Sequence, residues 1–258
     1  TALNRGRPPV EALDLVTYSL NPQVHSFSNL DLVETLTTQA VTVASAQQFC
    51  GGKPVAVGPV TLKIRWNPDA SGPEPPAPPG ELPRQVDARQ MSLFGAGWTM
   101  GSIKYLAEGG AHSLTYYETT GWLGVMERPE GSPLPDKFRS VPGGVFPMYH
   151  VFADVGAFAG GEVVISRSNA PLTVDSLVLR RDGRTRVLLA NYTPEPQRVT
   201  VQGLSGALTV RSLDETNAEA AMRDPEAFRA EAGRPLTAGG QGAVVEMMPY
   251  AVVRLDGR

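Results

Sequence analysis

The chain has 258 residues, of which 41% are hydrophobic and 19% charged, so it can form one large folded domain or two smaller ones. Its 23 lysines and arginines are outnumbered by 26 aspartates and glutamates, and a net charge of -3 argues against nucleic acid as a partner. No apolar run approaches the roughly 20 residues of a membrane span, and the N-terminus lacks a signal-peptide pattern. A single cysteine, Cys50, excludes an intrachain disulfide, so we expect a cytoplasmic protein without membrane contact.

The first part of the chain predicts strands that alternate with helices. Residues 13–20 form an apolar run typical of a strand buried on both faces. A helix follows, with Asn29 or Asp31 as its N-cap, and Gly51 is expected to end it. The second strand is predicted over residues 60–66.

A proline-rich segment separates this strand from the next helix. Seven prolines occur among residues 68–83, which favours an extended surface loop. A helix is predicted over 89–108, and its internal glycines indicate that its backbone packs closely on a sheet. A third strand over 113–117 and a short helix over 147–158 follow.

Beyond residue 161 the pattern changes to short strands with turns between them. Asp182-Gly183 is a strong hairpin signal, and residues 215–231 are polar and predicted to be helical. The spacing is typical of an antiparallel β-sandwich. The predicted strands cover residues 162–166, 173–181, 184–191, 197–202, 207–213, 243–247 and 249–256.

These elements predict an α/β part followed by an all-β part. Three β/α units are too few for a closed barrel, which needs eight, or for a comfortable open sheet. We therefore expect residues 1–160 to be the last three units of a (β/α)8-type barrel and residues 161–258 to be an independently folded β-sandwich. The remaining barrel units are then expected upstream of Thr1.

Several segments, taken in order, resemble the C-terminal part of D-apionate lactonase-like proteins. The likeness rests on NPQVH at 21–25, VTLKIRWN at 60–67, SLFGAGWTMG at 92–101, SLTYYETTGW at 113–122, LLANYTPEP at 188–196 and PYAVVRL at 249–255. The resemblance implies a glycoside-hydrolase-like barrel followed by a β-sandwich. It also implies a longer family chain, with an N-terminal domain and further barrel strands, so we expect residues 1–258 alone to lack activity.

Candidate site residues follow the three predicted parallel strands, because reactive groups of such folds lie at the carboxyl ends of their strands. Together they offer a carboxylate, an imidazole, a guanidinium, amides and aromatic rings, a mixture that suits polyhydroxylated substrates. We predict catalytic roles for Glu118 and His25, and substrate-binding roles for Asn21, Gln23, Arg65, Asn67, Tyr117 and Trp122.

Each principal candidate also has a structural interpretation. Glu118 is the leading catalytic residue if a partly desolvated pocket holds it, and otherwise a strand-end side chain bonded to loop amides. His25 either reaches the site or caps the following helix. Arg65 either orients a substrate oxygen or pairs with a structural carboxylate, and Trp122 either stacks on a sugar or plugs the barrel mouth.

The sequence displays no motif for a cofactor. The three histidines lie far apart, and Cys50 has no neighbouring metal ligand. No glycine-rich phosphate loop follows a strand. We therefore expect no metal or cofactor, and a small sugar acid or carbohydrate as the ligand.

The expected function is that of a carbohydrate-active hydrolase fragment, from an enzyme that opens a sugar-acid lactone with water. Glu118 would activate the water, and His25 or Arg65 would stabilise the oxyanion. Two alternatives remain: a retaining glycosidase, which needs a second carboxylate, and a module that binds carbohydrate or another chain without turnover. Three parallel strands would leave unpaired edges and an uncovered apolar face, so we also expect association with another copy or with the missing barrel half.

Overall fold

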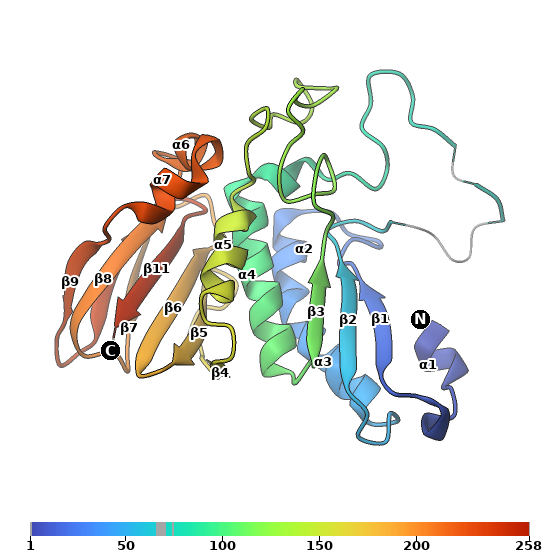
Figure 1. Ribbon diagram of the computed structural model, residues 1–258, viewed down its shortest axis with the longest axis horizontal. Coiled ribbons are helices and arrows are strands. Elements are labelled where there is room, and N and C mark those ends of the chain that lie inside the picture. Colours follow the sequence, from blue (N-terminus) through green and yellow to red (C-terminus); the bar gives the residue numbers. More distant parts are fainter. Residues whose placement is uncertain (1, 66–70, 74, 258) are drawn as a thin grey trace.

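The computed structural model describes residues 2–65, 71–73 and 75–257. A layer of helices lies between two sheets (Figure 1). On one side is a three-stranded parallel sheet, and on the other a six-stranded antiparallel sheet backed by a two-stranded one. Within the described ranges, no helix is both long enough and apolar enough to span a bilayer.

The α/β part comes first along the chain. Its elements are α1 (Ala2–Gly6), a 3-10 turn (Val10–Ala12), β1 (Val16–Leu20), α2 (Asn29–Glu34), α3 (Leu36–Gln47), β2 (Val55–Val60), a second 3-10 turn (Ala88–Met91), α4 (Leu93–Glu108), β3 (Ser113–Tyr116) and α5 (Met148–Gly156).

The all-β part follows. Its elements are β4 (Glu162–Val164), β5 (Val174–Arg181), β6 (Arg184–Asn191), β7 (Gln197–Val201), β8 (Gly206–Leu213), α6 (Ala218–Arg223), α7 (Pro225–Ala230), β9 (Arg234–Ala238), β10 (Ala243–Met247) and β11 (Val252–Gly257).

The predicted position of the second strand is wrong. β2 covers Val55–Val60 and lies between β1 and β3, whereas residues 61–65 leave the sheet apart from an isolated bridge between Gln23 and Lys63. Gly58-Pro59 looks like a strand breaker in the sequence, but here it is accommodated where the register between β2 and its neighbours shifts. Trp66, at the end of the predicted strand, lies outside the described residues.

The helix that follows β1, α2, has a different cap from the two that were predicted. Ser28 is the N-cap of α2, and its side chain accepts a hydrogen bond from the backbone N–H of Asp31. Asp31 accepts in return from the backbone N–H of Ser28, at 3.1 Å, so it is the third residue of a capping box and not the cap itself. Asn29 is the first helical residue, and its side chain binds Arg89.

The face of the parallel sheet that points away from the helices is small and polar, not apolar as predicted. Tyr18 and Tyr116 bond to Thr42 of α3 and Ser102 of α4, which places them on the helix side. Strand alternation then puts the intervening residues on the other face. These are Thr17 and Ser19 of β1, Ala56 and Gly58 of β2, and Ser113 and Thr115 of β3.

The predicted antiparallel strands of the all-β part are confirmed, and the described residues form one strand more than predicted. The six-stranded sheet has the order β4-β5-β6-β11-β8-β9, and β10 pairs with β7 in the second sheet. Asp182 and Gly183, both with positive φ, form the β5–β6 hairpin turn. β9 was missed because Pro235 interrupts its pattern, but it lies at the edge of the sheet, where a missing N–H is tolerated.

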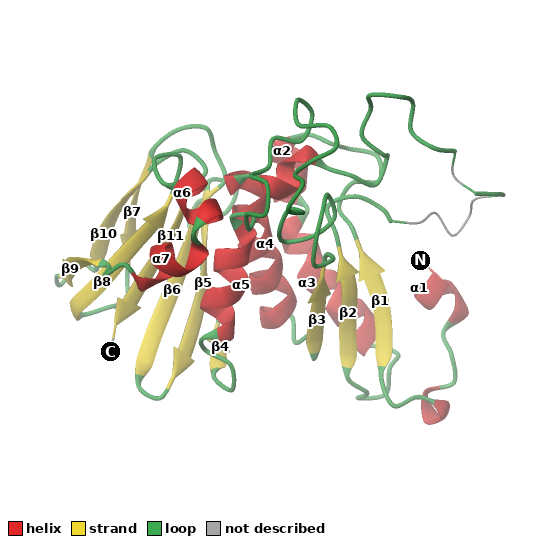
Figure 2. Ribbon diagram, turned by 45° about the horizontal axis from the view of Figure 1, so that its top comes forward, coloured by secondary structure: helices red, strands yellow, loops and turns green. Residues whose placement is uncertain are grey.

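The six-stranded sheet shares a core with the helices. Leu177, Leu188 and Val252 belong to the same buried cluster as Trp98 of α4, and Figure 2 shows the helices between the two sheets. Close approach is possible because α4 carries Gly97 and Gly101. A Cβ at Gly101 would lie 2.4 Å from the hydroxyl of Tyr192, and one at Gly97 would lie 3.4 Å from Ala190. The predicted close packing of this helix on a sheet is therefore confirmed.

A charged cluster also joins the two parts. Oδ1 of Asp154, at the end of α5, accepts hydrogen bonds from Arg186, Arg229 and Arg254 at 3.4, 3.1 and 2.9 Å. The Nε of Arg186 also donates to Asp256 at 2.6 Å. One carboxylate of the α/β part thus anchors β6, α7 and β11.

The shared core predicts how residues 161–258 behave alone. Without α4 and α5, the sheet would expose the apolar face that includes Leu177, Leu188 and Val252. We therefore expect this segment to retain strand structure by circular dichroism but to associate and to bind a hydrophobic dye. A monomer with a sharp unfolding transition would instead show that it folds independently, as the sequence alone suggests.

Candidate functional site

The predicted site residues lie at the carboxyl edge of the parallel sheet. All three arrowheads of β1, β2 and β3 point to this edge, where the long loops gather (Figure 1). In parallel α/β folds this edge carries the reactive groups.

Glu118 and Arg65 form an ion pair here, although 53 residues separate them. The Glu118 side chain is 52% exposed and that of Arg65 is 23% exposed. Leu123 supports both residues, because its carbonyl accepts from the backbone N–H of Glu118 at 2.9 Å and from Nη2 of Arg65 at 3.4 Å. The structure therefore holds a solvent-accessible carboxylate beside a partly buried guanidinium.

Tyr117 comes directly before this carboxylate and is buried. Its hydroxyl is 2.9 Å from Oγ1 of Thr99 on α4, and burial raises its pKa well above the ordinary range. Its φ angle is +46°, in the left-handed region that residues with side chains rarely adopt.

Gln23, Asp87 and Arg89 form a buried polar cluster beside the pair. Asp87 accepts from Gln23 Nε2 at 2.6 Å, and from Arg89 Nε and Nη2 at 2.9 and 2.7 Å. Gln23 also donates to the carbonyl of Leu62 at 2.8 Å and accepts from Arg89 Nη2 at 2.9 Å. Burial alone would raise the pKa of Asp87, but the bonds from Arg89 and Gln23 and the charge of Arg89 lower it overall.

This cluster ties three segments together and was missed in the sequence. Gln23 follows β1, Leu62 follows β2, and Asp87 caps the turn that leads into α4. The sequence signal for this cluster was an aspartate at the start of a helix, two residues before an arginine. Asp87 accepts a hydrogen bond from the backbone N–H of Arg89 at 2.9 Å, as an N-cap residue does. The amide of Gln23, predicted to bind substrate, donates both of its Nε2 hydrogens and accepts through Oε1 within the protein.

The other predicted residues take different positions. Asn21 is half-buried, and its Oδ1 has no hydrogen-bond partner within the described residues. Trp122 is half-buried, donates from Nε1 to Ser132 at 2.8 Å and lies against Phe138. His25 is exposed in the loop before α2, and none of the hydrogen bonds or ion pairs of the described residues includes its ring. Asn67 lies outside the described residues.

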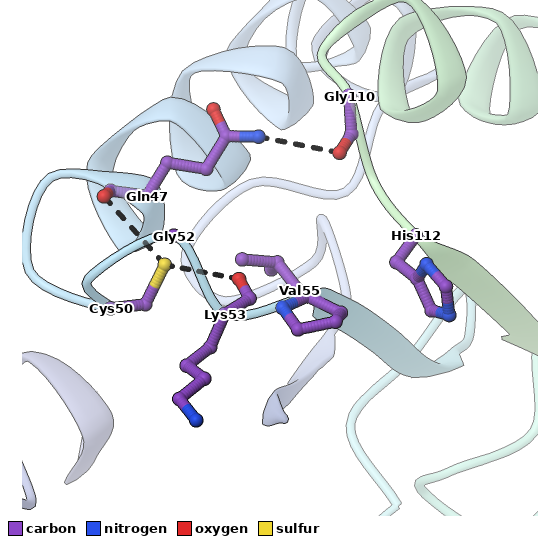
Figure 3. A pocket seen from close by; sticks show the side chains of 8 residues that line it. Gln47, Cys50, Gly52, Lys53, Val55, Gly110 and His112 are labelled. Carbon is purple, nitrogen blue, oxygen red and sulfur yellow. Dashed lines mark hydrogen bonds between the residues drawn. The ribbon is translucent and has the colours of Figure 1, made fainter. Parts of the chain in front are cut away.

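A separate cavity of about 440 Å³ opens at the opposite edge, near the amino ends of β2 and β3. Gln47, Cys50 and Lys53 line one side of it and His112 the other (Figure 3). The Sγ of Cys50 lies 3.6 and 3.3 Å from the carbonyl oxygens of Gln47 and Lys53, either of which can accept its single S–H. In the part of the chain that the structure describes, no three His, Cys, Asp or Glu side chains are grouped as a metal ion requires.

Chemically, the carboxyl edge combines a base, a cation and the half-buried amide of Asn21. A carboxylate open to solvent can take a proton from water, and a guanidinium can hold a developing negative charge. The partners that the described residues give the Glu118 carboxylate include the Arg65 guanidinium.

Known proteins are similar to this chain in sequence or in fold. A curated D-apionate lactonase of Brucella anthropi is 28% identical over 202 residues, which make up 78% of this chain and 31% of the relative. A bifunctional glucanase-xylanase from a metagenome library has a TM-score of 0.59 at 12% identity, covering 99% of this chain and 45% of its own. A thermostable α-L-arabinofuranosidase from Thermotoga petrophila has a TM-score of 0.62 at 12% identity, with 95% and 53% covered.

The chain thus spans about half of each of these solved structures and under a third of the curated lactonase. The model of the D-apionate lactonase TIM barrel domain matches residues 1–160, and that of the family's C-terminal immunoglobulin-like domain matches residues 171–255. The two family domains thus match the α/β part and the all-β part in the same order along the chain. The chain belongs to the D-apionate lactonase family.

Proposed function

We propose that this chain supplies catalytic groups to a carbohydrate hydrolase that opens a sugar-acid lactone with water. The observation that carries the proposal is the Glu118–Arg65 pair at the carboxyl edge of a D-apionate lactonase barrel domain. The lactone of D-apionate is the first substrate to test, because the relative from Brucella anthropi is a D-apionate lactonase.

In the proposed reaction, Glu118 removes a proton from water while the water oxygen bonds to the lactone carbonyl carbon. The carbonyl oxygen then becomes negatively charged, and Arg65 stabilises it. The bond between that carbon and the ring oxygen breaks, the ring oxygen takes the proton from Glu118 as a hydroxyl, and a carboxylic acid remains, which ionises at neutral pH.

Two polar atoms at this edge support ligand binding. Oδ1 of Asn21 and Nε of Arg65 are buried without a hydrogen-bond partner among the described residues. Buried polar atoms are nearly always satisfied in folded proteins, so orphans in a site are groups that a ligand can bind. A hydroxyl donor would suit Asn21, and a carbonyl or hydroxyl oxygen would suit Arg65.

We further propose that β1, β2 and β3 are the last three strands of an eight-stranded barrel. Their uncovered face carries small side chains such as Thr17, Ala56 and Thr115, which leave room for side chains from other strands. Residues 1–258 by themselves would then lack turnover and associate through the open edges of this sheet.

The cytoplasm is the proposed compartment, with no nucleic-acid or membrane partner.

A glycosidase is the second candidate, because the solved relatives above include a glucanase-xylanase and an arabinofuranosidase. A retaining glycosidase needs two carboxyl groups about 5 to 5.5 Å apart. Glu118 instead faces a guanidinium, and Asp87 is fully bound by Arg89 and Gln23. The lactonase reaction needs only the carboxylate that this chain provides, whereas a retaining glycosidase would need its second carboxylate from another barrel strand, so we propose the lactonase first.

The test measures acid release from D-apionate lactone in a pH-stat, using a polypeptide that joins this chain to the other barrel strands. Hydrolysis above the spontaneous rate is the expected result. Release of 4-nitrophenol from glycosides without lactone opening would favour the glycosidase. Saturable binding of the sugar acid with no turnover of either substrate would favour a binding module.

A further inference from the structure

We propose that Tyr117 is a positioning residue whose left-handed backbone, fastened to α4 through Thr99, directs the carboxylate of Glu118 toward Arg65. The sequence suggested that Tyr117 binds substrate. Its effect on catalysis rests on the proposed function, but its effect on the ion pair does not.

The side chain of Tyr117 is not available to a substrate in this arrangement. Only 6% of the residue is exposed, and its hydroxyl is engaged by Thr99. Its ring lies against those of Tyr116 and Phe152, at 5.7 and 6.3 Å between centroids. The ring is therefore part of the packing between β3 and the helices.

The backbone of Tyr117 breaks the alternation of β3. In a regular strand, successive side chains point to opposite faces, so Tyr116 and Tyr117 would lie on different sides of the sheet. Instead both hydroxyls bond to α4, Tyr116 to Ser102 and Tyr117 to Thr99. The φ angle of +46° at Tyr117 accompanies this change of direction.

This break decides where Glu118 points. If alternation continued from Tyr116, the next residue but one would return to the helix side, beneath the sheet. Glu118 lies at the edge instead, with its backbone N–H on Leu123 and its carboxylate on Arg65. A left-handed conformation in a residue with a side chain is strained and persists only where its surroundings hold it, and strain of this kind is concentrated at functional sites.

The chain provides a matched control for this arrangement. Tyr116→Phe and Tyr117→Phe each remove one hydroxyl bond to α4, of 2.8 and 2.9 Å, the first part-buried and the second buried. Tyr116 lies within β3, and only Tyr117 has the left-handed backbone. Both variants should therefore lower the melting temperature by similar amounts, and only Tyr117→Phe should disturb Glu118.

The first readout is the mobility of Arg65 in the chain as it stands, from the ¹⁵N–¹H heteronuclear NOE of its Nε–H. Arg65→Lys assigns the signal. We expect a rigid side chain in the native chain, in Tyr116→Phe and in Thr99→Ser, which keeps the hydroxyl. We expect a mobile one in Tyr117→Phe, in Thr99→Val and in Glu118→Gln, which weakens the ion pair.

The second readout is turnover of the lactone by the barrel-complete polypeptide, which joins this chain to the other barrel strands. Tyr117→Phe should lower kcat at least about 10-fold with KM within about 2-fold, because displaced catalytic groups slow the reaction without removing substrate contacts. Tyr116→Phe should stay within about 2-fold of the native kcat.

The outcomes separate the two proposals. A mobile Arg65 in Tyr117→Phe together with no native lactonase activity would keep the positioning role and refute the proposed reaction. A rigid Arg65 in Tyr117→Phe, or equal mobility in Tyr116→Phe and Tyr117→Phe, would overturn the positioning role whether or not the lactone is hydrolysed.

Discussion

Replacing Glu118 by glutamine should lower kcat for lactone hydrolysis by at least about 100-fold in the barrel-complete polypeptide. Glutamine keeps the size of the side chain but cannot accept the proton of the attacking water. Because Glu118 is half-exposed at the carboxyl edge, the change should leave the melting temperature within a few degrees of the native value. The measurement is kcat in a pH-stat at saturating lactone.

The matched control is Glu130→Gln, which removes an exposed carboxylate from the same long loop between β3 and α5. This variant should retain native kcat. Turnover of Glu118→Gln within a few-fold of Glu130→Gln would rule out Glu118 as the base and leave its pairing with Arg65 a structural feature.

Replacing Asp154 by alanine should reduce the free energy of unfolding by about 3 to 5 kcal/mol, the range for breaking a buried ion pair by removing one partner. Asp154 is 9% exposed, and its loss leaves Arg186, Arg229 and Arg254 facing one another with one carboxylate fewer. In a chain of this size, the melting temperature should fall by roughly 6 °C or more. Calorimetry and urea unfolding provide the two measurements.

Glu246→Ala is the control for Asp154→Ala. Glu246 pairs with Arg198 across β7 and β10, but both side chains are about two-thirds exposed, at 67% and 71%. Exposed pairs contribute about 0 to 1 kcal/mol, so this variant should unfold near the native midpoint. Equal losses in the two variants would show that the Asp154 cluster does not bind the two parts of the fold together.

Local patterns in the sequence predict most elements of this fold. β6 and β10 begin and end where alternation and turn residues place them, because their signals lie within the strand or next to it. β2 was misplaced because its position depends on pairing with β1 and β3, which lets Gly58-Pro59 stay in the sheet. The polarity of the uncovered sheet face was also predicted wrongly. The face on which Thr17 and Thr115 lie is known only from the hydrogen bonds of Tyr18 and Tyr116 to the helices.

The site was predicted less fully, because its contacts join distant segments. Glu118 and Arg65 were each predicted near strand ends, although β2 ends at Val60 and Arg65 lies beyond it; their pairing across 53 residues follows from the sheet order. Asp87 and Arg89 looked like ordinary helix-start residues, and their role emerges only with Gln23 as the third partner. The left-handed backbone at Tyr117 has no sequence signal, because tyrosine normally favours a strand.

The close fit of α4 against the six-stranded sheet bears on recombination between members of this family. A graft that exchanges the immunoglobulin-like domain at its boundary would keep Gly97 and Gly101 but bring foreign side chains in place of Ala190 and Tyr192. Any larger residue at position 190 would meet the helix backbone, and any smaller one at position 192 would leave a void. Successful hybrids should therefore take α4 and the immunoglobulin-like domain from the same parent, which makes that helix the natural unit of exchange with the domain.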